Sequence, residues 1–172
     1  MNIETMCKKT VNLYRQYDAK RQFIWKDTEH LSSILVSLNI HLGQLAEVCG
    51  LDYTKIDGIT DSSKELRLEK LVVVMQDFIL LSTICNWTDK LSISEKETKR
   101  LTILPKDDKN QLNILYLSIE NMLLKSFYEK DVIAFHHAWI LFLKWGKTDL
   151  NFTENEIQVA FQKKIEKDLK LI

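Results

Sequence analysis

Glycine and proline are scarce in this chain of 172 residues, which contains four glycines and one proline. These residues favour the tight turns that a β-rich fold needs in quantity, so their scarcity argues against sheets. Leucine, isoleucine, lysine and glutamate instead dominate segments whose apolar residues recur at helical spacing. We therefore expect an all-α fold, and the length suits a single domain over residues 1–172 with its own hydrophobic core.

Cysteine is also rare, and its pattern argues against a disulfide framework. Cys7, Cys49 and Cys85 are odd in number and lack the spacing of metal ligands. We expect them to be buried thiols of a protein that works in a reducing compartment, the cytoplasm. The first twenty residues mix charged and apolar side chains, so they do not have the uninterrupted apolar core of a signal peptide.

The chain has no excess of charge of either sign, because 24 acidic residues balance 24 basic ones. A nucleic-acid footprint requires clustered positive charge, so nucleic acid is not an expected partner. Long hydrophobic runs are missing as well, since Gln76 and Asp77 interrupt the most apolar segment well short of the ~20 residues that span a membrane. We expect no membrane partner.

The most apolar segment, Leu66 to Ile84, is the centre of the predicted fold. Its apolar residues cover nearly the whole circumference of a helix, which predicts burial by neighbours on all sides. One arc of roughly 120° is polar at 100° per residue, and it carries Glu69, Lys70, Gln76 and Asp77. Charged groups are seldom buried alone, so this arc faces either a cleft or a network of polar groups on a neighbouring helix.

The remaining helices follow from apolar periodicity. We expect them over residues 2–17, 28–49, from 107 or 108 onward, 131–146 and from 153 onward, with a short exposed one in SEKETKR before Pro105. Five or six helices with short loops predict an antiparallel bundle. The polar connection over residues 88–107 is predicted to be its mobile part.

Capping residues mark where these helices begin and end. The expected N-terminal caps are Asp27 or Thr28, Ser62 with Glu65, Asp107 or Asp108, Asp131, and Thr153 with Glu156. Gly50 is placed to end the second helix in a left-handed conformation.

Three stretches of the sequence resemble one family. HLGQLAEV at 41–48, LEKLVVVMQDFILL at 68–81 and LFLKWGKTDLNFTENEIQVAFQKK at 141–164 are similar, in this order, to the all-α nucleoside triphosphate pyrophosphatases, the superfamily of MazG and the dimeric dUTPases. In that family one helix carries Glu-x-x-Glu, as in ELGELAE, and a second carries Glu-x-x-Asp, as in EELADVL. Carboxylates one turn apart on facing helices can hold Mg²⁺ together. The resemblance implies this fold and an association of subunits.

This chain departs from the family at all four metal ligands. The aligned phrases place His41 and Gln44 at the first two glutamates, and Lys70 and Val73 at the third glutamate and the aspartate. Valine has no ligand atom, and an ammonium group would repel a cation. The resemblance therefore implies a catalytically degenerate protein for which no metal cofactor is expected.

Five residues remain candidates for a site. Glu69 and Asp77 are the acids of the arc, but eight residues separate them by about 12 Å along a helix, too far to bind one ion easily. His41 is a possible base or replacement ligand, although imidazole suits Mg²⁺ poorly, and a structural hydrogen bond would equally account for it. Lys70 and Gln44 are candidates for substrate contacts, with Lys70 as a built-in cation that neutralises Glu69 or Asp77 in place of Mg²⁺.

Three functional hypotheses follow. The first is a degenerate dUTPase- or MazG-like protein that acts as a binding, structural or assembly subunit, with a possible nucleotide ligand and a homodimer or another protein as partner. The second is an active Mg²⁺-dependent pyrophosphatase that splits dUTP-type nucleotides at a rearranged metal site of Glu47, Glu65, Glu69 and Asp77. The third is a helical adaptor unrelated to the family.

Overall fold

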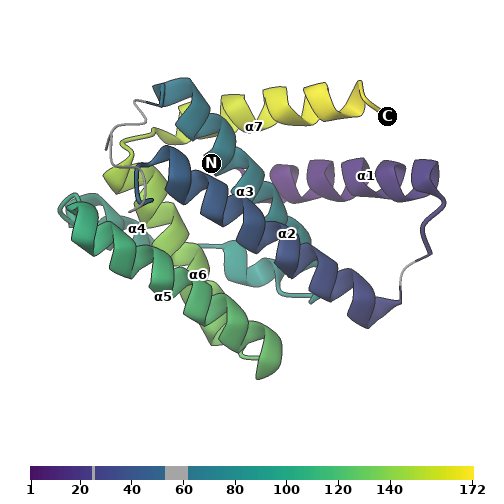
Figure 1. The fold of residues 1–172 in the computed structure, drawn as a ribbon, viewed down its shortest axis with the longest axis horizontal. Helices are drawn as coiled ribbons and strands as arrows, with labels where there is room; N and C mark the ends of the chain where they lie inside the picture. Colours follow the sequence, from purple (N-terminus) through teal and green to yellow (C-terminus); the bar gives the residue numbers. More distant parts are fainter. Residues whose placement is uncertain (25, 53–61) are drawn as a thin grey trace.

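The structure is a computed structural model that describes residues 1–24, 26–52 and 62–172, and this part of the chain is helical without strands (Figure 1). Its seven α-helices are α1 Ile3–Arg21, α2 Asp27–Val48, α3 Lys64–Ile84, α4 Glu95–Ile103, α5 Lys109–Tyr128, α6 Val132–Lys144 and α7 Glu154–Leu169. A 3₁₀ turn, η1 (Thr88–Leu91), precedes α4, and a π-helical turn, η2 (Trp145–Asp149), continues α6. The all-α prediction is confirmed.

Helix α3 lies at the centre of the arrangement and contacts α1, α2 and α7 (Figure 1). The hairpin of α5 and α6 packs beside this group. Helices α2 and α3 run antiparallel, as expected for neighbours in the sequence, but α1 and α7 run parallel: Asn2 bonds to Gln158 near their starts and Lys20 to the Ile172 carbonyl near their ends. The expectation of antiparallel packing therefore fails for this pair, because no short loop joins the two ends of the chain.

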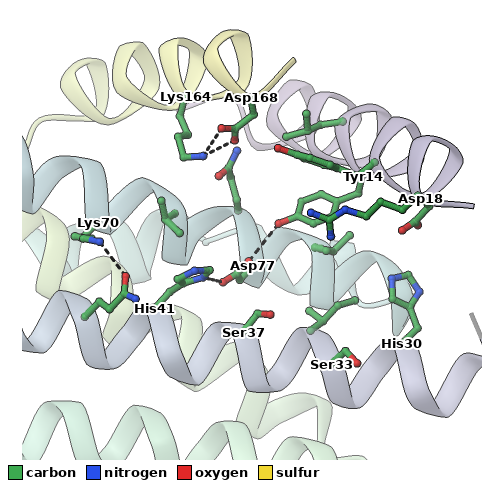
Figure 2. Close-up of a pocket in the computed structure, with 18 residues that line it drawn as sticks. Tyr14, Asp18, His30, Ser33, Ser37, His41, Lys70, Asp77, Lys164 and Asp168 are labelled. Carbon is green, nitrogen blue, oxygen red and sulfur yellow. Dashed lines mark hydrogen bonds and ion pairs between the residues drawn. The ribbon is translucent and has the colours of Figure 1, made fainter. Parts of the chain in front are cut away.

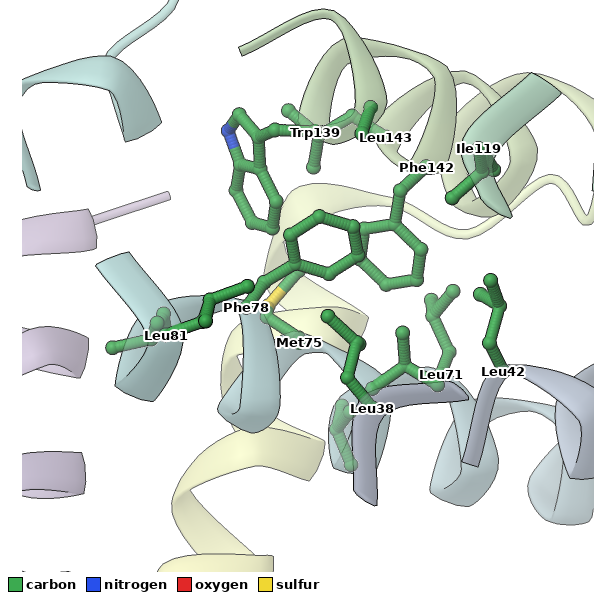
Figure 3. Close-up of a cluster of buried hydrophobic side chains, with 14 of the residues drawn as sticks. Leu38, Leu42, Leu71, Met75, Phe78, Leu81, Ile119, Trp139, Phe142 and Leu143 are labelled. Carbon is green, nitrogen blue, oxygen red and sulfur yellow. The ribbon is translucent and has the colours of Figure 1, made fainter. Parts of the chain in front are cut away.

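The predicted all-round burial of the central helix is confirmed from Leu71 to Ser82, whereas Leu66 near its start is 37 % exposed. Eleven residues of α3 between Leu71 and Ser82 are buried. Phe78 faces α6, where its ring lies 5.5 Å from Trp139 and 5.1 Å from Phe142 between centroids (Figure 3). The ring of Phe135 lies 5.9 Å from it. Rings at these separations add attraction to the burial of their area, so this cluster holds α3 against α6.

Several predicted caps are found, and two are wrong. Asp108, Asp131 and the Thr153–Glu156 capping box begin α5, α6 and α7. Helix α3 is capped by Ser63 and not by Ser62. The Ser62 hydroxyl donates to the Val48 carbonyl, and this bond connects the start of α3 to the end of α2. Helix α2 follows Lys26, which makes no side-chain cap, and Asp27 is its first residue. The predicted loop over residues 51–61 lies mostly outside the described residues.

The connection over residues 88–107 contains η1 and α4 and makes specific contacts. The Trp139 indole donates to the Leu91 carbonyl at 2.9 Å. His136 contacts the Lys90 carbonyl through Nδ1 at 2.6 Å and the Glu97 carboxylate through Nε2 at 2.9 Å. The mobility of this connection stays a prediction. Its short helix has a full capping box, which is why the described residues hold seven helices where five or six were expected.

Helix α6 ends at Lys144, close to the expected stop near Gly146, but a π-helical turn follows it where none was predicted. The chain continues through η2, where the buried Lys144 ammonium contacts Asp149 at 3.1 Å and Asp107 at 2.6 Å. A Cβ on Gly146 would lie 3.0 Å from the Leu71 side chain, so glycine lets this turn approach α3 closely. The ion pairs of Lys144 and the close approach of Gly146 to Leu71 thus hold the turn that follows α6.

Among the residues that the structure describes, five at helix ends adopt the left-handed region. Gly50 does so at φ 75°, as predicted, and the other four are not glycine: Gln22, Asn86, Lys130 and Asn151, with φ between 56° and 58°. A side chain in this region is strained, least for asparagine.

By length and composition alone, α2 over Glu29–Val48 could cross a membrane, the one helix of the described residues that could. Core helices of soluble proteins meet the same criteria, and α2 buries Leu38, Leu42 and Leu45 against its neighbours. This feature is weak evidence, and the absence of a membrane partner stays a prediction.

Candidate functional site

A cleft of about 440 Å³ opens between α1, α2, α3 and α7 (Figure 2). The α3 wall is the predicted polar arc without Glu69, and it carries Lys70, Val73, Gln76, Asp77 and Leu80. The α2 wall presents polar side chains at steps of three or four residues, which one face of a helix requires: His30, Ser33, Ser37, His41 and Gln44. The arc therefore faces a cleft, and part of it also belongs to a polar network.

Asp77 is the centre of that network. It is 2 % exposed, and its carboxylate contacts His41 Nδ1 at 2.5 Å and accepts a long hydrogen bond from the Tyr14 hydroxyl at 3.4 Å (Figure 2). Burial raises the pKa of Asp77, while the bonds from His41 and Tyr14 and the charge of Lys164 oppose this rise. Because a carboxylate only accepts, Nδ1 of His41 carries a proton and Nε2 is left for other contacts.

The Tyr14 hydroxyl is held in its neutral form by the same surroundings. Burial and the nearby Asp77 carboxylate both raise its pKa far above the ordinary value. Tyr14 therefore acts as a hydrogen-bond donor at any physiological pH.

Two lysines enter the cleft from different helices. Lys164 of α7 is paired with both carboxylate oxygens of Asp168. Lys70 of α3 donates to the uncharged Gln44 side chain at 2.9 Å, and in the described parts of the chain no carboxylate lies within ion-pair distance of it. The expected neutralisation of Asp77 by Lys70 is thus replaced by the contact with His41.

Gln76 leaves a buried donor without a partner. The residue is 3 % exposed and lines the cleft, yet no acceptor among the described residues lies within hydrogen-bond distance of its side-chain Nε2. Buried amide groups without partners are uncommon and cost free energy, so each requires an explanation.

The remaining predicted acids lie elsewhere. Glu65 and Glu69 line a shallow groove between α3 and α7, opposite Lys163 and Lys167. Glu47 lines another groove, between α2 and α5. The structure does not bring these three to Asp77, and within the described ranges no three His, Cys, Asp or Glu side chains are placed to hold a metal ion.

The residues present do not fit Mg²⁺. Positions 41, 44, 70 and 73 face the cleft together, but they offer an imidazole, an amide, an ammonium group and a hydrocarbon side chain. Mg²⁺ requires oxygen ligands, of which carboxylates are the usual ones. We derive no metal-dependent step at this cleft.

The three cysteines do not contribute to the cleft. They are free, partly buried thiols, and burial raises the pKa of each, to about 12 for Cys49. Thiols held in the protonated form are poor nucleophiles and poor metal ligands.

Sequence reasoning missed the wall of the cleft that comes from the two ends of the chain. Tyr14, Tyr17 and Arg21 of α1 and Lys164 and Asp168 of α7 line it. The α2 stripe from His30 to Gln44 could have been found by its helical spacing, but only His41 and Gln44 were identified.

Comparison with protein-family models, with curated proteins and with solved structures gives no match. The resemblance to the all-α pyrophosphatases therefore stays a prediction that depends on the residues of the three stretches.

Proposed function

We propose that the protein is a catalytically degenerate relative of the all-α nucleoside triphosphate pyrophosphatases whose cleft binds a nucleotide without hydrolysing it. One observation carries the proposal: the four positions at which the resemblance implies metal ligands all line one cleft, and none is a carboxylate. They are His41, Gln44, Lys70 and Val73. Each pair of positions is three residues apart on one of two helices that pack against each other, and this places all four on the same cleft.

The chemistry of the cleft supports binding more than hydrolysis. A metal-dependent pyrophosphatase needs an ion to activate water and to neutralise the phosphates. Here the buried Asp77 carboxylate already contacts His41, and the Lys70 ammonium would repel a cation placed beside it. The hydrogen-bond donors and the positive charge that remain suit a bound ligand.

Association with a second copy is part of this proposal. Helices α2 and α5 are in contact and expose apolar side chains at helical spacing: Val36, Ile40, Ile114 and Leu117. Exposed apolar patches of this kind mark interaction surfaces. We expect light scattering to give about twice the mass of the 20.2 kDa chain, and the double substitution Ile40→Glu, Leu117→Glu to return it to one chain. A wild-type protein with the mass of one chain at micromolar concentration would contradict self-association and leave a different protein as the partner.

The test of the proposed function measures binding and turnover on the same samples. Calorimetry across deoxynucleoside and ribonucleoside phosphates, with Mg²⁺ or with EDTA, should detect binding that EDTA does not abolish. Pyrophosphate release with Mg²⁺ should not exceed that of Glu69→Ala and Asp77→Ala.

Two results would contradict it. Mg²⁺-dependent pyrophosphate release that is lost in both variants would establish an active enzyme with a rearranged site. Failure of every nucleotide to bind would favour the unrelated adaptor.

A further inference from the structure

We propose that α5 is the dimerisation helix of this protein and that it pairs, parallel and in register, with α5 of a second copy. The inference rests on the self-association that forms part of the proposed function, and it specifies which residues meet and how they are arranged. It starts from the outward face of α5, which carries an apolar stripe exposed to solvent.

Helix α5 is apolar on two opposite faces. The face toward the bundle buries Leu115, Ile119 and Leu123. At 100° per residue, the exposed stripe is centred about 180° from these three, so it points away from the bundle, at whose edge α5 lies (Figure 1). The stripe places five exposed residues at alternating steps of three and four: Ile114, Leu117, Asn121, Leu124 and Tyr128.

The stripe has the pattern of a parallel coiled coil of two strands. Alternating steps of three and four keep one face of a helix against its partner, with apolar residues at the first and fourth positions of a seven-residue repeat. Isoleucine at the first position, here Ile114, and leucine at the fourth, here Leu117 and Leu124, favour two strands over three or four. Helix α5 is already packed against α6, so pairing does not require a helix that would be only marginally stable in isolation.

The amide in the stripe indicates what covers it. Asn121 occupies the first position of its repeat, between Leu117 and Leu124. In a parallel pair that is in register, equivalent first positions face each other, so the two Asn121 amides can bond to one another. In an antiparallel pair, or against an unrelated apolar helix, the amide would face hydrocarbon and lose its bonds to water. Asn121 therefore favours a second copy of α5 in a single register.

The charges that flank the stripe are complementary in the same arrangement. Glu120 lies on one side of the stripe and Lys125 lies on the other, five residues later. In parallel coiled coils these positions of opposite strands form ion pairs, so Glu120 of each copy can pair with Lys125 of the other. In an antiparallel pair the two Glu120 carboxylates would face and repel each other.

Both flanking residues keep capacity for a second partner. Within the chain, Glu120 bonds to the Tyr116 hydroxyl and the Lys125 ammonium contacts Asp131 at 3.1 Å. A carboxylate has two accepting oxygens and an ammonium group has three donors, so neither residue is saturated by these contacts.

The first test measures the mass of surface variants by light scattering and sedimentation equilibrium. Leu124→Glu places two carboxylates against each other within the pair, so we expect the dissociation constant of the dimer to rise at least about hundredfold. Leu124 is 40 % exposed, so the variant should keep the circular dichroism spectrum of the folded protein. Val36→Glu, on the part of the apolar patch that belongs to α2, is the matched control and should dimerise as the wild type does.

The second test determines the register. Leu117→Cys should give a disulfide-linked dimer under mild oxidation, because position 117 of one copy faces position 117 of the other only in the parallel pair. Val159→Cys, exposed on α7, is the control and should stay unlinked. Asn121→Leu should tighten association and form species larger than a dimer, because an asparagine at this position restricts a coiled coil to two strands.

The outcomes separate this inference from the proposed function. A wild-type protein with the mass of one chain would overturn both the pairing of α5 and the self-association. A dimer that Val36→Glu dissociates and Leu124→Glu does not, or that Leu117→Cys fails to link, would overturn the pairing and leave self-association intact. Failure of every nucleotide to bind would overturn the binding role of the cleft and leave the pairing of α5 unaffected.

Discussion

The two sides of α3 differ in what they do for the protein. Toward α6 the helix presents Phe78 to the rings of Phe135, Trp139 and Phe142, and this contact is apolar. Figure 3 shows it at Trp139 and Phe142. Toward the cleft it presents Lys70 and the buried Asp77 carboxylate (Figure 2) and also Gln76; within the described residues Lys70 has no carboxylate partner and Gln76 Nε2 has no acceptor. The first side stabilises the fold, while the second contains groups that cost free energy when buried. Such costs are expected where binding is the purpose.

The largest effect should come from breaking the apolar side. Phe78→Ala removes a ring that is fully buried between α3 and α6, so we expect a loss of about 3–5 kcal/mol in the free energy of unfolding. Urea denaturation measures it. Val73→Ala, on the cleft side of the same helix, is the control and should cost about 1 kcal/mol or less, because Val73 is only partly buried. Equal losses at the two positions would contradict the contrast between the sides.

A second prediction concerns Lys144, a buried cation that pairs with the carboxylates of Asp107 and Asp149. Lys144→Met leaves the buried Asp149 and the neighbouring Asp107 without their cation, so we expect a loss of about 3 kcal/mol. The solvent-screened pair of Lys125 with Asp131 is the control, and Lys125→Met should change the stability far less than Lys144→Met does. If Lys144→Met and Lys125→Met unfold at the same urea concentration, burial does not determine how much these ion pairs contribute to stability.

A third prediction sharpens the description of the cleft side. Burial raises the pKa of Asp77 above its unfolded value, so the native state binds this proton before the unfolded chain does. Asp77 therefore lowers stability at neutral pH, and this penalty disappears as the pH falls below its native pKa. Asp77→Asn should be within about 1 kcal/mol of the wild type at pH 7, and its stability relative to the wild type should decline on acidification. Unfolding measured from pH 7 to pH 4 tests this, and a relative stability that rises instead would contradict it.

The smallest effect is expected outside both sides of α3, at the cap of α4. Bonds from Ser94 and from His136 lower the pKa of Glu97 to about 2. This carboxylate therefore contributes stability above its unfolded pKa, and the contribution is lost as the pH falls toward 2. Glu97→Gln keeps the capping oxygen and loses the charge, so we expect about 0.5 kcal/mol less stability at pH 7. The difference should vanish near pH 2, and one that persists there would assign the effect to the cap geometry.

Local signals in the sequence predicted much of the fold. Asp108, Asp131 and Thr153 begin their helices as expected, because a cap is a contact between residues three positions apart. The cap of α3 was predicted at Ser62 but lies at Ser63. Both residues have a side chain that can cap a helix, and only the path of the backbone decides which of them does. The π-helical turn after α6 was missed, because one contact that accompanies it, the ion pair of Lys144 with Asp107, joins positions far apart in the sequence.

The site was predictable only where helical spacing reveals it. His41, Gln44, Lys70 and Asp77 were identified from two helices, and all four line the cleft. Glu69 was grouped with them because the arc is wide, but it faces the groove beside α7. Tyr14 and Lys164 could not be placed, because the parallel packing of the first helix on the last leaves no periodic trace in either segment.

The left-handed helix ends suggest substitutions that would raise the thermal stability of the protein. Gln22 and Lys130 adopt a backbone conformation that suits glycine, as do Asn86 and Asn151 to a smaller extent. A side chain that is not asparagine costs about 1 kcal/mol there. Replacing Gln22 and Lys130 by glycine should therefore raise thermal tolerance without touching the cleft, which neither residue lines. The chain contains only four glycines, so helix ends that would accept glycine at a lower cost carry other residues. Substitution at these ends is therefore a way to increase its thermal stability.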